Sequence, residues 1–176
     1  MKQGFSHIGL ATHDMAATIA FYEGMLGLPR VVDIKNHVRD GGVVRMVYFE
    51  CGEDEFLVFQ ECKGVDGIPA DFDTGINNAL GVPTGLYHFA FKVNSVEALE
   101  AKKTELAALG LEVSKTVDHG YAQSIFVRDP NDLEVEFCCM TRRFVPADLQ
   151  RESQVEIVTK PAASVDTQQT APRPML

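Results

Sequence analysis

Apolar residues recur along the first half of the chain with two different periods. Residues 15–26 carry apolar side chains at helical spacing, with Asp14 before them as an N-cap and Gly27 after them as a stop. This spacing predicts a helix. Shorter β-rich runs, separated by turn residues rich in glycine and aspartate, predict strands at residues 5–11, 30–35, 43–50 and 55–60.

The second half repeats the same order of elements. A helix is predicted over residues 96–109, where apolar side chains recur at helical spacing, Asn94 or Ser95 serves as the cap and Gly110 follows. The β-rich runs of this half predict strands at residues 86–93, 111–116, 123–128 and 133–140. The chain is therefore a β-α-β-β-β unit that occurs twice, about 80 residues apart.

The two copies align on their strands. Placing His7 on His88 brings the helices and their glycine stops into near register, and placing Tyr48 on Phe126 superimposes the last hairpins without a gap. Five elements in the same order are too many for a chance similarity. The sequence therefore predicts two tandem βαβββ modules.

One domain is expected over residues 1–145, with module one at 5–60, a linker at 61–85 and module two at 86–140. The linker is rich in Gly, Pro and Asp and is long for a loop without structure of its own, and such loops are often functional. Residues 146–176 form a C-terminal extension in which Pro, Thr, Gln and Ser predominate, so we expect a largely flexible tail.

Composition and charge limit the class of protein. The 176 residues are 45% hydrophobic, enough for a sizeable core, and the net charge of −9 argues against binding to nucleic acid or anionic lipid. No apolar run approaches the roughly 20 residues that span a bilayer. The cysteines form no CxxC pair and the N-terminus lacks the pattern of a secretory signal, so we expect a cytoplasmic protein with reduced thiols.

Two histidines and a glutamate are the strongest candidates for chemistry. His7 and His88 occupy equivalent places in the first strand of each module, and a pseudo-two-fold relation between the modules allows both imidazoles to point into one cleft. Glu134 and Glu136 share one face of the last predicted strand, because side chains alternate along a strand. Carboxylates inside a sheet are costly unless they are solvated or paired. Two interpretations stay open, the solvent face of an edge strand and a carboxylate held at a metal ion.

Four segments of the chain match the motifs of a known family. They are SHIGL at residues 6–10, FYEGMLGL at 21–28, YHFAF at 87–91 and DPNDLEVE at 129–136. With them, the chain resembles the vicinal oxygen chelate superfamily, which includes glyoxalase, bleomycin resistance proteins and extradiol dioxygenases. The resemblance implies an α+β fold in which the two modules form one curved mixed β-sheet around a metal cleft, with the helices outside. It also implies a homodimer, formed in some members by exchange of modules, and it implies the metal ligands His7, His88 and Glu136.

The resemblance includes a fourth ligand position, in the last strand of module one, where glyoxalase-like and epimerase-like relatives have Glu or Gln. The ungapped alignment places Val58 there, and its side chain cannot bind a metal. Gln60 lies two residues further on, on the same strand face, and could reach in only in another register. The site is therefore expected to have three protein ligands, and two His with one carboxylate form the facial triad of non-heme Fe(II) oxygenases.

This ligand set and the resemblance together imply a dioxygenase-like enzyme that acts on a small aromatic or vicinal-oxygen substrate. One divalent metal ion per chain is expected, with Fe(II) or Mn(II) favoured. A glyoxalase-like lyase or an epimerase that uses Zn²⁺ or Ni²⁺ is the alternative, since a Lewis acid can polarise a carbonyl without consuming O₂. A third option is a non-catalytic protein that binds a small molecule such as a drug, although members that sequester bleomycin lack the ligands that are intact here.

One position departs from the ring-cleaving relatives. They usually carry a Tyr where this chain has Phe126, and they carry a further His before the second ligand, whereas residues 60–87 contain none. His119 and Tyr121, just before the strand predicted at residues 123–128, are candidates for proton transfer instead. Simple solvation of a loop explains these two residues equally well.

Overall fold

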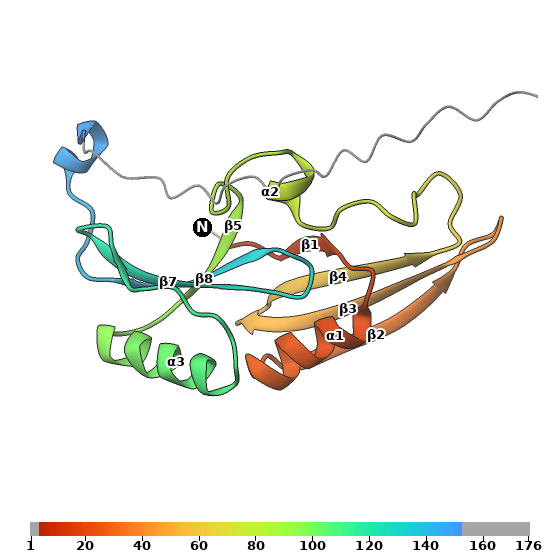
Figure 1. Ribbon diagram of the computed structural model, residues 1–176, viewed down its shortest axis with the longest axis horizontal. Coiled ribbons are helices and arrows are strands. Elements are labelled where there is room, and N and C mark those ends of the chain that lie inside the picture. Colours follow the sequence, from red (N-terminus) through yellow and green to blue (C-terminus); the bar gives the residue numbers. More distant parts are fainter. Residues whose placement is uncertain (1–3, 153–176) are drawn as a thin grey trace, which may run out of the picture.

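The computed structural model describes residues 4–152, and two small mixed sheets carry most of this part of the chain (Figure 1). Module one contains β1 (His7–Ala11), α1 (Met15–Ile19), the π-helical turn η1 (Ala20–Met25), β2 (Arg30–His37), β3 (Val43–Gly52) and β4 (Glu55–Lys63). The linker contains α2 (Ile76–Ala79). Module two contains β5 (His88–Lys92), α3 (Val96–Ala108), β6 (Val117–Asp118), β7 (Ala122–Arg128) and β8 (Glu134–Met140), and the 3₁₀ turn η2 (Pro146–Gln150) follows. Most of the predicted tail lies outside the described residues.

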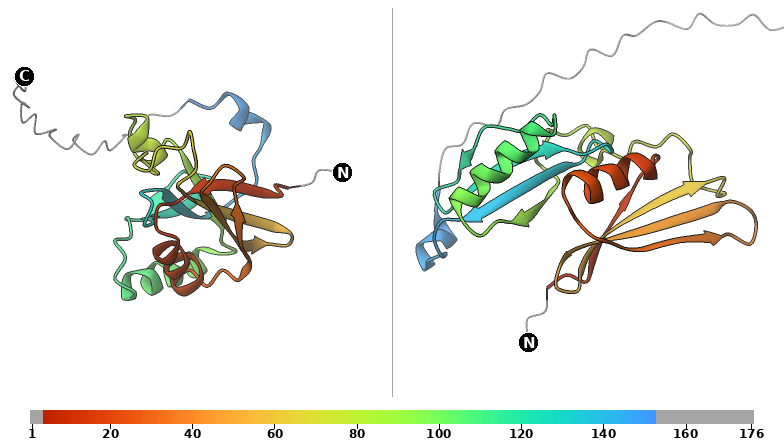
Figure 2. Two further views of the ribbon diagram at one scale, coloured as in Figure 1. Left: turned by 90° about the vertical axis from the view of Figure 1, so that its right-hand side faces the viewer. Right: turned by 90° about the horizontal axis from the view of Figure 1, so that it is seen from below.

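Each module forms one four-stranded sheet. The strand orders are β1-β4-β3-β2 and β5-β8-β7-β6, and the first pair of each sheet is parallel while the other pairs are antiparallel. The predicted α+β fold of two βαβββ modules is confirmed. Within residues 4–152 the two sheets are not hydrogen bonded to each other, so two sheets stand in place of one continuous sheet. Figures 1 and 2 show α1 and α3 on the same side of the sheets. Among the described residues, no helix is long and apolar enough to cross a membrane.

The register of the strands confirms the internal repeat. In each sheet, the first strand of the module runs parallel to the last strand, and the last strand pairs antiparallel with the one before it. Superimposing the two registers equates His7 with His88, Phe56 with Glu134, Tyr48 with Phe126, and Val58 with Glu136. The ungapped alignment of the two hairpins is therefore also the structural alignment, and positions of module one have defined counterparts in module two.

The two predicted helices are present, with a difference in the first. Asp14 caps α1 through its side chain, and a serine caps α3 in the same way. Residues 20–25 then wind as a wider π-helical turn, in which the N–H of Leu26 donates to the carbonyl of Phe21 at 2.9 Å. This wider turn lets the consecutive residues Phe21 and Tyr22 both face the core, where both are buried.

The strand predicted at residues 111–116 is wrong, because only Val117–Asp118 pair with β7 on that side. Ser114 provides the physical reason. Its backbone N–H donates to the carbonyl of Phe126 at 3.0 Å, but its side-chain hydroxyl accepts the N–H of Phe126 at 2.9 Å in place of a backbone carbonyl. Serine hydroxyls compete with backbone groups in this way, and here the competition interrupts the ladder.

One hydrophobic core joins the two modules, with side chains from α1, β3 and β4 packed against those from α3, β7 and β8. Inside this core, the hydroxyl of Tyr22 donates to the carboxylate of Asp129 in the β7–β8 turn at 3.0 Å. Asp129 also accepts the backbone N–H groups of Asn131 and Leu133, each at 2.8 Å, and the side-chain amide of Asn131 at 2.9 Å. Burial raises the pKa of the Tyr22 hydroxyl and that of the Asp129 carboxyl.

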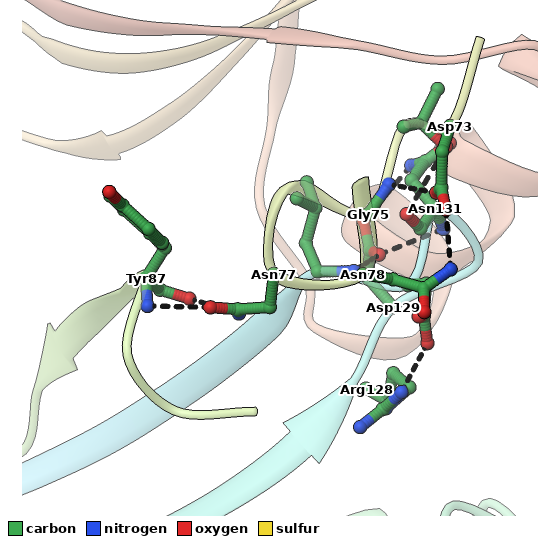
Figure 3. Close-up of polar contacts among 11 residues, drawn as sticks. Asp73, Gly75, Asn77, Asn78, Tyr87, Arg128, Asp129 and Asn131 are labelled. Atoms are coloured by element: carbon green, nitrogen blue, oxygen red, sulfur yellow. Dashed lines mark hydrogen bonds and ion pairs between the residues drawn. The ribbon is translucent and has the colours of Figure 1, made fainter. Parts of the chain in front are cut away.

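The linker packs on module two through polar contacts (Figure 3). The hydroxyl of Thr74 donates to the carbonyl of Asn131 at 3.2 Å. The buried side chain of Asn77, in α2, donates to the backbone carbonyl of Tyr87 and accepts the backbone N–H of the same residue, both at 2.8 Å. Residues 74–77 of the linker are therefore attached both to the β7–β8 turn and to Tyr87, just before β5.

Tyr22→Phe should destabilise the protein, because it removes a buried hydrogen bond to a carboxylate. We expect a loss of about 1.5–3 kcal/mol in the free energy of unfolding. For a chain of this length, roughly 2–4 °C of melting temperature is lost per kcal/mol. Thermal unfolding followed by circular dichroism measures the loss, with Tyr87→Phe, at an exposed tyrosine, as the control. Equal melting temperatures for the two variants would show that the hydroxyl of Tyr22 does not hold the modules together.

The same hydroxyl predicts a dependence of stability on alkaline pH. Because the folded-state pKa of Tyr22 lies above its ordinary value of 10.0, the folded protein binds this proton more tightly than the unfolded chain. The contribution is complete below pH 10.0 and is lost as the pH rises towards the folded-state pKa. The free energy of unfolding should therefore fall more steeply above pH 10 in the wild type than in Tyr22→Phe, by up to about 1.4 kcal/mol per pH unit. Urea unfolding between about pH 9 and pH 11 tests this difference in slope, and equal slopes would contradict it.

Candidate metal centre

Glu136 lies on the central strand β8, between β5 and β7, and is only 6% exposed. This position excludes the interpretation of the last strand as a solvent-facing edge strand. Glu134, on the same face, is half-buried, and one of its carboxylate oxygens is buried without a hydrogen-bond partner in the described structure. A buried carboxylate is costly unless partners compensate its charge, so the contacts of Glu136 decide what this position does.

His88 is the closest partner of Glu136. The Nε2 atom of His88, on β5, lies 2.9 Å from Oε2 of Glu136. The Nδ1 atom of the same ring lies 2.7 Å from the backbone carbonyl of Gly85, which can only accept a hydrogen bond. Nδ1 therefore carries a ring proton, and Nε2 is the nitrogen that faces the carboxylate, where it can either donate a second proton or offer a lone pair to a cation. Two electron-pair donors that face each other at this distance suit a shared cation.

The backbone around residue 85 positions the imidazole of His88. Gly85 has a φ of 89°, a left-handed conformation that favours glycine, and this turn directs its carbonyl towards Nδ1. The two hydrogen bonds from Asn77 fix the backbone of Tyr87, next to His88 (Figure 3). The linker thus sets both the position and the tautomer of the histidine.

A second partner holds the other oxygen of the carboxylate. The hydroxyl of Ser124, on β7, donates to Oε1 of Glu136 at 2.5 Å. Phe126, two residues further along β7, places its ring edge-on to the ring of His88, with centroids 6.1 Å apart. The pair of His88 and Glu136 is therefore bordered by one polar and one aromatic side chain of the same strand.

The pair opens into a cavity of about 550 Å³. His119 and Tyr121 line this cavity together with His88, Glu136 and the ring of Phe126. The rings of His119 and Tyr121 are nearly parallel, at an interplanar angle of 26° with centroids 6.1 Å apart. The two residues predicted for proton transfer are therefore brought to the same cavity as two of the three predicted ligands.

His7 is not brought to this cavity. Its ring lies beside Tyr48 of its own module, with ring centroids 6.4 Å apart, and its Nδ1 atom contacts the hydroxyl of Ser6 at 3.2 Å. Across residues 4–152, no three His, Cys, Asp or Glu side chains lie close enough together to hold a metal ion. In the described part of one chain, His88 and Glu136 are therefore in contact, while the third predicted ligand, His7, lies apart from them.

The register also locates the fourth ligand position. Val58 is the counterpart of Glu136, and Gln60 lies two residues further along β4, opposite Met46 and Ala11. The counterpart of Gln60 in module two is Cys138 rather than a predicted ligand. Module one therefore offers a histidine at the ligand position of its first strand and an apolar residue at that of its last strand.

Several residues that shape the pair were missed from the sequence, namely Ser124, Gly85 and Asn77. Ser124 carried a usable signal, because it has the same parity as Phe126 on the predicted strand and thus shares its face. Gly85 and Asn77 lie in the linker, where no period specifies which groups come close to which. Their contacts with His88 and Tyr87 depend on the tertiary packing of α2.

Comparison with known proteins places this geometry in context. The family model described as the Glyoxalase/Bleomycin resistance protein/Dioxygenase superfamily matches residues 4–137. No curated protein sequence is similar enough to match.

Solved structures with the same fold have different descriptions. A lactoylglutathione lyase from Agrobacterium tumefaciens is 21% identical, with a TM-score of 0.55 over 78% of this chain and 94% of its own. The genomically encoded fosfomycin resistance protein FosX from Listeria monocytogenes is 20% identical, with a TM-score of 0.54 over 80% of this chain and 96% of its own. An antibiotic-binding protein from a Streptomyces species is 16% identical, with a TM-score of 0.55 over 80% of this chain and 98% of its own. At these identities the likeness concerns the fold.

Proposed function

The chain belongs to the Glyoxalase/Bleomycin resistance protein/Dioxygenase superfamily, and on this basis we propose that it is a metal-dependent enzyme with His7, His88 and Glu136 as metal ligands. Proteins of this family commonly bind a divalent metal ion. The proposed substrate is a small aromatic molecule or another molecule with two vicinal oxygens. The proposed reaction is dioxygenase-like.

The observation that carries the proposal is the contact between His88 and Glu136. The carbonyl of Gly85 engages Nδ1 and so directs Nε2 towards a carboxylate oxygen at 2.9 Å, where Nε2 is placed to bind a cation. A proton or a metal ion can bridge this contact. With a divalent ion, both donors are satisfied at once, and a backbone carbonyl that fixes the other ring nitrogen is the usual support of a metal-bound histidine.

We place His7 of a second copy of the chain beside this pair. Proteins of the family often form dimers, and the pair of module two has no third ligand nearby in the described part of one chain. His7 in turn has only Phe56 and Val58 where its counterpart has carboxylates. Each module thus supplies what the other lacks, and a homodimer that brings module one of one chain to module two of the other completes the site.

The proposed roles of the remaining residues follow from the cavity. A bound Fe(II) or Mn(II) ion would supply redox chemistry with O₂ and would be chelated by the two substrate oxygens. Phe126 lines the cavity next to His88 and would limit the access of water to the bound ion. His119 and Tyr121 lie at the same cavity and would exchange protons with the substrate hydroxyl groups.

A second candidate is a lyase or epimerase that uses Zn²⁺ or Ni²⁺. The observation in its favour is Phe126 itself, because a phenyl ring beside His88 cannot donate the proton that ring-cleaving relatives take from a tyrosine. Chemistry that only polarises a carbonyl needs no such donor at that place.

The metal site predicts the metal content of single variants. His88→Ala, Glu136→Ala and His7→Ala should each lose most of the bound divalent ion, because each removes one of the proposed ligands. Val58→Ala, at the apolar counterpart of Glu136, should keep it. Elemental analysis of the purified proteins measures this. Full occupancy in His88→Ala would exclude the proposed site.

Mixed dimers of His7→Ala and Glu136→Ala chains test where His7 binds. If the site is shared between copies, one of the two sites in the mixed dimer keeps all three ligands, and about half of the wild-type metal is retained. If the ligands come from one chain, each chain carries a defect, and the mixed dimer should bind no more metal than the parent variants.

The reaction class predicts which ion supports turnover. Apo-protein loaded anaerobically with Fe(II) should consume O₂ in the presence of a catechol or a hydroxylated aromatic acid, and Glu136→Ala should abolish this uptake. His119→Ala should slow turnover about 100-fold or more and leave the metal content intact, since loss of a general acid–base costs that much. A parallel assay uses Ni²⁺ or Zn²⁺ with glutathione hemithioacetals. Turnover there, with no O₂ uptake in the first assay, would overturn the dioxygenase-like proposal in favour of the lyase.

A further inference from the structure

Ser124 is a polar residue in an otherwise closely packed part of the second sheet. It lies in the middle of β7, opposite Cys138 of β8, and its exposed fraction is 0%. A buried hydroxyl costs free energy unless it forms a hydrogen bond. The side chain of Ser124 meets this requirement by donating to Oε1 of Glu136 at 2.5 Å.

The two oxygens of the Glu136 carboxylate therefore have different partners. Oε1 accepts the hydroxyl of Ser124, and Oε2 faces Nε2 of His88 at 2.9 Å. Rotation of the carboxylate would exchange the two oxygens, and the hydrogen bond from a fixed β-strand opposes that rotation. Only Oε2 thus faces the imidazole of His88.

The first module supplies an internal comparison. In the superimposed registers, the counterpart of Ser124 is Met46, and the counterpart of Glu136 is Val58. The hydroxyl and the carboxylate therefore occur together in one module, and both are replaced by apolar side chains in the other. The sheet of module one accepts an apolar residue, Met46, at the position of Ser124. The fold therefore does not require a hydroxyl there, and its presence in module two is explained by the neighbouring carboxylate.

We propose that Ser124 is a positioning residue that orients Glu136 so that a single oxygen, Oε2, binds the metal ion. The proposal rests on the proposed function, because it assumes that His88 and Glu136 hold a metal. Hydrogen-bonding partners of metal ligands tune both the affinity and the ligand geometry. Loss of the Ser124 hydroxyl should therefore lower the affinity for the metal ion without removing any of its ligands.

The test uses Co(II) as the probe, because its visible absorption spectrum reports the number and type of its ligands. Ser124→Ala should weaken Co(II) binding about 10- to 100-fold in a competition titration with a chelator, and it should change the visible spectrum. Ser114→Ala is the matched control, because Ser114 also lies beside β7 and bonds to Phe126 rather than to Glu136. Its affinity and spectrum should match those of the wild type.

Undiminished affinity and an unchanged spectrum in Ser124→Ala, with binding lost in Glu136→Ala, would overturn the role of Ser124 alone. No Co(II) binding by the wild-type protein would overturn the proposed metal site as well. Should Ser124→Ala fail to fold, Ser124→Val decides the matter, because it lacks the hydroxyl, adds no metal-binding group and suits a β-strand. It should also weaken the binding of Co(II), and wild-type affinity in that variant would exclude the proposal.

Discussion

Asp129 lies in the turn between β7 and β8, and its carboxylate accepts hydrogen bonds from both halves of the chain. The hydroxyl of Tyr22 reaches it from module one, and the backbone of Asn131 and Leu133 surrounds it from module two. A carboxylate buried in this way is tolerated only while its partners remain in place. Because Tyr22 lies on the helical segment and Asp129 precedes β8, this contact fixes the strand that carries Glu136 relative to the helices that cover the core.

The two modules have the same strand order but different side chains at the positions of the proposed metal site. Module two places a histidine against a buried carboxylate and supports each with its own hydrogen bond, from Gly85 and Ser124. Module one has the equivalent histidine, but Phe56, Val58 and Met46 stand where module two has Glu134, Glu136 and Ser124. Polar groups in the middle of a sheet need a full set of partners, so a half-built copy would be less stable than an apolar one. This requirement explains why the carboxylate and its serine are absent together.

Much of the fold could be predicted from the sequence, because periodicity, caps and turn residues are local signals. The repeat, both helices and the equivalence of His7 with His88 are examples. The strand expected at residues 111–116 could not be corrected in this way, since the hydroxyl of Ser114 and the backbone of Phe126 meet only in the folded chain. The contact of Gly85 with His88 depends on a left-handed turn, and the position of His7 depends on how whole modules pack. Neither is encoded in the pattern of a single segment.

The shared register also has an evolutionary consequence. Val58 stands in the first sheet where Glu136 stands in the second, so a single substitution there would add a carboxylate two residues along the strand from the position opposite His7. A duplicated module of this kind contains a second position at which a substitution can add or remove a metal-binding side chain while the backbone stays the same. Descendants of one ancestral gene could thus diverge in metal preference, and with it in reaction type, by changes at one side chain.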